Sequence, residues 1–81
     1  MRVPTSEQFD RETARFRASY ANGETATVIE LTTFSRFTPV NQPPQTLKGM
    51  RHYELDDGTP VNWIDDDTFK NVVSGEVMRK V

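Results

Sequence analysis

The first part of the chain places apolar side chains at the spacing of a helix. The residues of this stripe, which follow one another at intervals of four, three and four, are Phe9, Thr13, Phe16 and Tyr20. Such intervals put side chains on one face of an α-helix, and the Asn22-Gly23 pair that follows is a common helix stop. The pattern predicts an N-terminal helix over about residues 5–21, with a narrow apolar edge.

The next stretch has the composition of a β-strand. Residues 25–34 are dense in Thr, Val, Ile and Phe, which favour pleated structure. A Pro-rich connection over residues 39–49 follows, and its adjacent prolines Pro43-Pro44 favour a stiff, extended backbone. Neither half of the chain is large enough to fold alone, so we expect the strand to join the same sheet as the C-terminal half.

The C-terminal part, about residues 51–81, alternates short strand-like runs with turn-forming residues, which is typical of a β-meander. The four predicted strands lie at about 51–55, 59–64, 68–73 and 76–81. Asp-Asp-Gly, Asp-Asp-Asp and Ser-Gly separate them, and all of these residues favour turns. This style of short strands with Asp-Gly turns, over about the last 30 residues, resembles the small β-meanders of phage and bacterial accessory proteins. The resemblance implies no activity.

The register of the first hairpin follows from its turn. A three-residue loop over residues 56–58, with Gly58 in the left-handed conformation, pairs Tyr53 with Val61 and Arg51 with Trp63. This register gathers apolar residues on one face and turns His52 and Glu54 outward. The predicted inner face consists of Tyr53, Leu55, Val61 and Trp63.

Together these elements predict a single small α+β domain over residues 1–81: one N-terminal helix packed on a small, mainly antiparallel sheet that ends in a C-terminal β-meander. The helix stripe is expected to meet Ile29, Leu31, Tyr53, Val61 and Trp63. Only 35% of the 81 residues are hydrophobic, so the core is thin. A thin core favours a chain that completes its packing against a second copy or a partner.

The sequence offers little catalytic chemistry. It has no cysteine, a single histidine at position 52 and four isolated glycines, so thiolate chemistry, a multi-histidine metal site and a Gly-rich phosphate loop are excluded. No spacing ties His52 to a nucleophile or an acid. We therefore expect no enzyme activity, no cofactor and no metal site.

Two acidic clusters stand at the ends of the predicted strand 59–64. The predicted acidic rim consists of Glu54, Asp56, Asp57, Asp65, Asp66 and Asp67. The two clusters lie about 20 Å apart along an extended strand, too far to share one cation. Turn formation is the simplest interpretation, a weak divalent site within 65–67 is one alternative, and a partial imitation of a nucleic-acid backbone is another.

Basic residues are concentrated in the first half. Arg11, Arg15 and Arg17 predict a basic face on the N-terminal helix, which is either solvated or turned toward an acidic partner. A mildly basic N-terminal half and an acidic C-terminal half would also favour self-association of the chain. The aromatic residues Tyr53 and Trp63 resemble base-stacking groups, but we expect them in the core, and the nearby carboxylates would repel phosphates.

The first hypothesis is a small non-catalytic protein-interaction domain of bacterial or phage accessory type that binds a protein partner or forms a homodimer. The first alternative is a phage-type inhibitor that uses the acidic hairpin face against a nucleic-acid-binding enzyme. The second alternative is a weak single-stranded nucleic-acid binder, which the net charge of -2 disfavours. No apolar run reaches the ~18 residues of a membrane span and the N-terminus lacks the apolar region of a signal peptide, so we expect a cytoplasmic protein without membrane contact.

Overall fold

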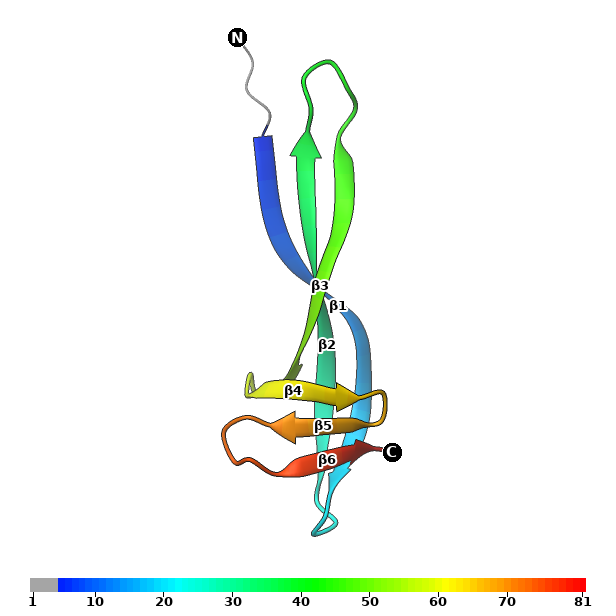
Figure 1. Ribbon diagram of the computed structural model, residues 1–81, viewed down its shortest axis with the longest axis vertical. Coiled ribbons are helices and arrows are strands. Elements are labelled where there is room, and N and C mark those ends of the chain that lie inside the picture. Colours follow the sequence, from blue (N-terminus) through cyan, green and yellow to red (C-terminus); the bar gives the residue numbers. More distant parts are fainter. Residues whose placement is uncertain (1–4) are drawn as a thin grey trace.

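The computed structural model describes residues 5–81, and within this range it contains six β-strands and no helix. The strands are β1 (Thr5–Tyr20), β2 (Thr25–Thr38), β3 (Gln45–Leu55), β4 (Pro60–Asp65), β5 (Thr68–Asn71) and β6 (Val77–Lys80). Each strand pairs antiparallel with the next, and β6 pairs back onto β1, so the sheet closes into a barrel (Figure 1). The predicted α+β class is therefore wrong, and the protein is all-β.

The molecule is long because three of its strands extend well beyond the barrel. Figure 1 shows β4, β5 and β6 lying across one end of β1 and β2, while the other halves of β1, β2 and β3 continue as a three-stranded arm. We define the arm as residues 5–13, 32–38 and 45–52. The extents are 60 × 20 × 19 Å and the radius of gyration is 16.9 Å, against about 12 Å for a compact domain of this length.

The predicted N-terminal helix is replaced by β1, and a β-bulge explains the misleading pattern. The pairing of β1 with β2 shifts register between Glu12 and Ala14, which leaves Thr13 as an extra residue. Side chains of a strand alternate between faces, and a bulge reverses the alternation. Phe9 and Phe16, seven positions apart, therefore lie on the same face of β1, as they would in a helix.

The Asn22-Gly23 pair forms the hairpin turn between β1 and β2, where a helix stop was predicted. Gly23 has a φ of 90°, in the left-handed region that glycine adopts readily. The Tyr20 amide donates to the Glu24 carbonyl at 2.7 Å, and the Asn22 side chain accepts from the Glu24 amide. The same two residues are common in both kinds of turn, so they could not distinguish a helix from a hairpin.

The core fills the barrel and does not extend into the arm. Its buried residues are Ala18, Val28, Leu55, Val61, Phe69 and Met78. The ring of Phe69 lies 5.1 Å from the ring of Phe16 and 5.1 Å from that of Tyr53, measured between centroids. Phe9 instead stacks on Phe34 in the arm, at 5.8 Å. The predicted contact of the whole N-terminal stripe with one core is thus wrong for Phe9.

The C-terminal meander is confirmed, with one exception in its first hairpin, formed by β3 and β4. Tyr53 pairs with Val61, and Gly58 has a φ of 90°, both as predicted. The predicted pairing of Arg51 with Trp63 is wrong, because β3 and β4 pair only at Tyr53 and Glu54. Trp63 consequently lies outside the core, with 52% of its surface exposed.

The connection before the meander is shorter than predicted. The strand predicted at 25–34 is β2, which continues to Thr38, and β3 begins at Gln45, within the segment that was predicted to be Pro-rich linker. Residues 45–50 therefore belong to a strand of the arm. Their pattern gave no sign of this, since the run Gln-Thr-Leu-Lys-Gly-Met contains neither alternation nor several β-branched residues.

Candidate functional site

The strand β3 has an open edge along most of its length. It pairs with β4 only at Tyr53 and Glu54, whereas it pairs with β2 from Gln45 to Leu55. Within residues 5–81, the segment Gln45–His52 therefore has a strand on one side only. Half of its backbone amides and carbonyls point away from β2, and such groups are able to pair with a further strand.

A groove of about 400 Å³ lies where β3 and β4 separate. Its lining residues are Gly49, Met50, Arg51, Tyr53, Trp63 and Asp66. The groove is apolar at Met50 and Trp63, and it carries one cationic and one anionic side chain, Arg51 and Asp66. It adjoins the open edge directly, because its first three lining residues belong to that edge.

The open edge is exposed along its whole length. Every residue of Gln45–His52 is exposed, including Leu47 at 54% and Met50 at 84%. Met50 lies in the groove with Trp63, which is 52% exposed, and Leu47 is a further exposed apolar group of the same strand. Clustered exposed apolar groups are a common feature of protein-binding surfaces.

The carboxylate of Glu30 contacts two of the residues that line the groove. Glu30 of β2 accepts a hydrogen bond from the Thr13 hydroxyl at 2.7 Å and another from the Tyr53 hydroxyl at 3.0 Å. The guanidinium of Arg51 lies 3.9 Å from the same carboxylate. These contacts connect the bulge of β1 to the hydroxyl of Tyr53 by hydrogen bonds, and they place the exposed Arg51 near the same carboxylate.

The same contacts shift the pKa values of Glu30 and Tyr53. The pKa of Glu30 is lowered, first by the hydrogen bond from Thr13 and then by that from Tyr53 and the charge of Arg51, with burial opposing them. The pKa of Tyr53 is raised by burial and by its hydrogen bond to Glu30. At neutral pH the network therefore consists of an ionised Glu30 and a neutral Tyr53 that donates to it.

A second irregularity shapes β3 beside the groove. The register between β2 and β3 shifts between Thr32 and Phe34. Gly49 lies here, so close to β2 that a Cβ atom added to it would come 2.9 Å from the Thr33 carbonyl oxygen. Only glycine lets the backbones approach so closely without displacement. Gly49 thus fixes the path of the open edge next to Met50.

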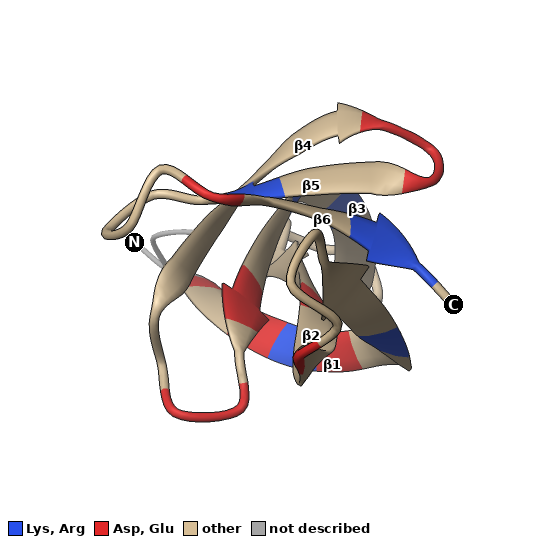
Figure 2. Ribbon diagram, turned by 90° about the horizontal axis from the view of Figure 1, so that it is seen from below, with Lys and Arg blue, Asp and Glu red and all other residues tan. Residues whose placement is uncertain are grey.

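The acidic rim is divided between two turns. Asp57 accepts hydrogen bonds from the amide and hydroxyl of Thr59, and Asp65 accepts one from the Asp67 amide. These bonds lower the pKa of both Asp57 and Asp65. The turn between β4 and β5 carries the second cluster and lies on the same side of the molecule as the basic end of β6 (Figure 2), where Thr68 pairs with Arg79 and the Lys80 amide donates to the Asp67 carbonyl at 2.8 Å.

Turn chemistry accounts for the side chains of Asp57 and Asp65. Of the six predicted rim residues, Asp66 is the one that lines the groove. Asp56 donates its backbone amide to the Thr27 carbonyl, and Glu54 is half-buried opposite Ile29 and Pro60. A role of the acidic rim in binding stays a prediction.

The three N-terminal arginines lie on a strand and do not share one face. Arg15 and Glu12 form an ion pair at 2.7 Å, and Arg17 donates to the Thr25 hydroxyl. Arg11 lies on the other face of β1, with its guanidinium 5.8 Å from the centroid of the Phe9 ring. Because the helix is absent, the predicted basic helix face is not formed.

His52 lies on the outer face of the arm, with its imidazole Nε2 3.8 Å from an Asp10 carboxylate oxygen. Among residues 5–81, no three His, Cys, Asp or Glu side chains come together as metal ligands would. The described residues also contain no helix of the length and hydropathy needed to cross a membrane.

Comparison with known proteins finds no matching family model, no similar curated protein and no similar solved structure.

Proposed function

We propose that this chain is a non-catalytic protein-interaction domain that binds an extended segment of a protein along the open edge of β3. The observation that carries the proposal is the segment Gln45–His52, a strand with one irregularity at Gly49 that is exposed on every residue and paired on one side only. An exposed, partly apolar strand edge is a template for another strand.

The binding mode that fits is strand addition. A segment lying along Gln45–His52 would form backbone hydrogen bonds with β3, which supply affinity with little dependence on sequence. Specificity would come from the groove, where Met50 and Trp63 suit an apolar side chain of the partner. Lys48 and Arg51 on the edge favour a partner segment that carries carboxylates.

The Gly49 irregularity and Lys48 are also features that protect natural sheet edges from indiscriminate pairing. Their presence is consistent with a selective edge. A bulge limits the length over which an arbitrary strand stays in register, and a cation rejects basic strands. The proposed partner is therefore acidic over the part of its segment that lies against Lys48.

Site-specific photo-crosslinking in cells of the source organism tests the proposal. Met50→p-benzoylphenylalanine places the reactive group in the groove, and Val73→p-benzoylphenylalanine places it in the turn between β5 and β6 as a matched control. Both native side chains are highly exposed, at 84% and 77%. We expect protein adducts from position 50 that position 73 does not give. Identical adducts from both positions, or none from position 50, would contradict the proposal.

A second candidate function rests on Trp63. An exposed tryptophan beside Arg51 resembles the stacking platforms of single-strand nucleic-acid binders. Such binding weakens steeply with salt, so an oligonucleotide mobility shift at low salt that disappears in Trp63→Ala would support it.

The hypothesis of an inhibitor that binds a nucleic-acid-binding enzyme places the binding site on the acidic turns. It predicts that charge reversal abolishes capture of the enzyme, with all five aspartates of the turns replaced: Asp56, Asp57, Asp65, Asp66 and Asp67.

A further inference from the structure

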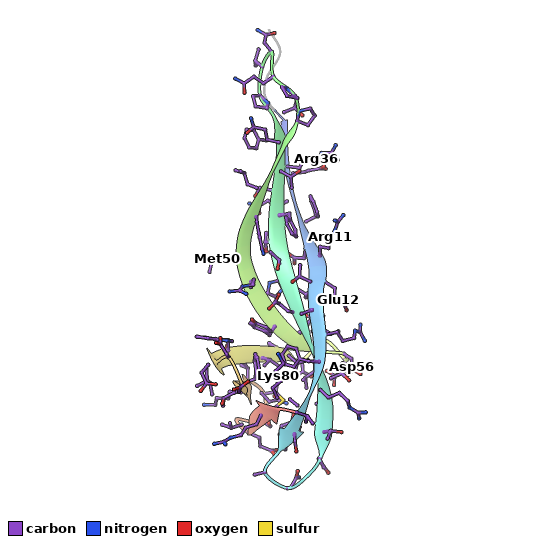
Figure 3. The ribbon with its side chains drawn as sticks, turned by 90° about the vertical axis from the view of Figure 1, so that its right-hand side faces the viewer. Arg11, Glu12, Arg36, Met50, Asp56 and Lys80 are labelled. Carbon is purple, nitrogen blue, oxygen red and sulfur yellow. The ribbon has the colours of Figure 1, made fainter. Side chains whose placement is uncertain are left out.

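The arm has a second open edge, on the side opposite to β3. β6 joins β1 only at Ala18, Ser19 and Tyr20, and the Val81 amide adds a bond to the Arg17 carbonyl. Before that point β1 pairs with β2 alone among the described strands. Figure 3 shows Met50 extending from the β3 side of the arm, away from Arg11 and Glu12 on β1. The arm thus presents two unpaired edges.

The two edges carry opposite charge. The β1 segment from Glu7 to Glu12 is exposed except at Phe9 and contains three carboxylates, at positions 7, 10 and 12, and one arginine; Glu12 is ion-paired with Arg15 of the same strand. The β3 segment Gln45–His52 contains Lys48 and Arg51 and no carboxylate. One edge is therefore acidic and the other basic, although the whole chain has a charge of only -2.

This charge pattern discriminates among the ways in which two copies could join their arms. Pairing β3 with β3 would bring lysine and arginine near their equivalents, and pairing β1 with β1 would do the same for carboxylates. Like charges on neighbouring strands are destabilising, whereas opposite charges are favourable. Only the pairing of β1 with β3 brings complementary edges together.

Strand direction is compatible with that pairing. β1 and β3 are both antiparallel to β2, so they run in the same direction. A second copy displaced sideways in the plane of the arm, or rotated about an axis along it, would lay its β1 parallel to the β3 of the first. Such a contact leaves one edge free on each outer copy, so further copies can add in the same way. The assembly is then a closed ring or an open filament.

We propose that the partner of the β3 edge is the β1 edge of a second copy of this chain, in a head-to-tail arrangement of arms. This inference rests on the proposed function, and it names the partner. The acidic segment that the β3 edge favours is then Glu7–Glu12, whose one apolar side chain, Phe9, is half-buried against Phe34.

Charge reversal with rescue tests the arrangement. Glu7 and Lys48 suit the test, because neither forms a salt bridge or side-chain hydrogen bond within the described structure. Glu7→Lys makes the β1 edge more basic, and Lys48→Glu makes the β3 edge more acidic. Sedimentation velocity of the full chain, over about 5–500 μM, measures association of each variant, and circular dichroism confirms that each is folded.

The wild-type chain is expected to form species larger than a dimer as its concentration rises. Each single variant should associate about tenfold more weakly, since one like-charge contact replaces one opposite-charge contact. The double variant Glu7→Lys/Lys48→Glu exchanges the charges of the two positions and should recover most of the association. Lys70→Glu, an exposed lysine of β5, serves as the control and should associate like the wild type.

Two results would overturn the inference: a wild-type chain that stays monomeric over the whole range, or single variants that associate as strongly as the wild type. The experiments also distinguish failure of this inference from failure of the proposed function. A monomeric chain that still gives position-specific adducts of another protein from Met50→p-benzoylphenylalanine retains the β3 edge as a binding site and loses only the second copy as its partner.

Discussion

Glu30 joins the barrel to the arm through hydrogen bonds that need its carboxylate. Its side chain is only 16% exposed, and Thr13 and Tyr53 both donate to it. A hydrogen bond to a charged group contributes more than one between neutral groups. Glu30 therefore stabilises the junction of the barrel and the arm as long as its carboxylate is ionised.

The pH dependence of stability tests this role. The pKa of Glu30 is lowered by folding, so its contribution is complete above its unfolded pKa, about 4.3, and is lost as the pH falls through its folded pKa. Glu30→Gln should lower the free energy of unfolding by about 1 kcal/mol at pH 7. The difference from the wild type should shrink as the pH falls through the folded pKa of Glu30, as urea denaturation over a series of acidic pH values can measure.

A matched control separates this effect from the loss of any carboxylate. Glu76→Gln removes an exposed glutamate from the turn between β5 and β6 and should leave the free energy of unfolding at pH 7 nearly unchanged. If Glu30→Gln were as stable as the wild type at pH 7, or if the difference did not depend on pH, Glu30 would not have the role described here.

Phe69 and Trp63 pair across β4 and β5, yet they are expected to have different roles. Phe69 is 2% exposed and contacts two aromatic rings, whereas Trp63 is 52% exposed. Phe69→Ala should cost about 3–5 kcal/mol of stability. Trp63→Ala should cost less than about 1 kcal/mol and should weaken partner binding. Urea denaturation of both variants checks the contrast, and a cost for Trp63→Ala as large as that for Phe69→Ala would place Trp63 in the core.

At the scale of the element, the sequence determined the meander better than the first strand. Asp57, Gly58 and Gly75 have local turn preferences that agree with the fold, and the breaks between β3 and β6 could be predicted from them. The strand conformation of β1 could not be predicted from local preferences. Its bulge at Thr13 reverses the alternation that would have indicated a strand, and a long-range partner, β2, provides the hydrogen bonds that decide its conformation.

The candidate site was also only partly predictable. Trp63 was expected in the core because an apolar side chain in a short strand is usually buried. Its exposure follows from the early separation of β3 and β4, which depends on the path of β3 through the arm. The open edge itself could not be found in the sequence, because Gln45–Met50 lies beside Pro43-Pro44 and has the composition of a linker.

At the scale of the whole molecule, the unusual property is shape. A small barrel contains the core, and the arm extends from it with little apolar burial of its own beyond the stacked pair Phe9 and Phe34. A sheet of three strands needs a hydrophobic face or a packing partner to be stable by itself, and the arm buries few apolar side chains. Under the proposed strand addition, the added strand would supply backbone hydrogen bonds to the arm and would stabilise it.

The most direct test of strand addition is residue-resolved hydrogen exchange of the full chain, free and bound to the protein that Met50→p-benzoylphenylalanine captures, whether that is another protein or a second copy. Strand addition predicts that the outward-facing amides of Gln45–His52 become protected on binding, while protection within β4, β5 and β6 changes little. Protection that appears instead at the acidic turns 56–58 and 65–67, with residues 45–52 unchanged, would contradict the account.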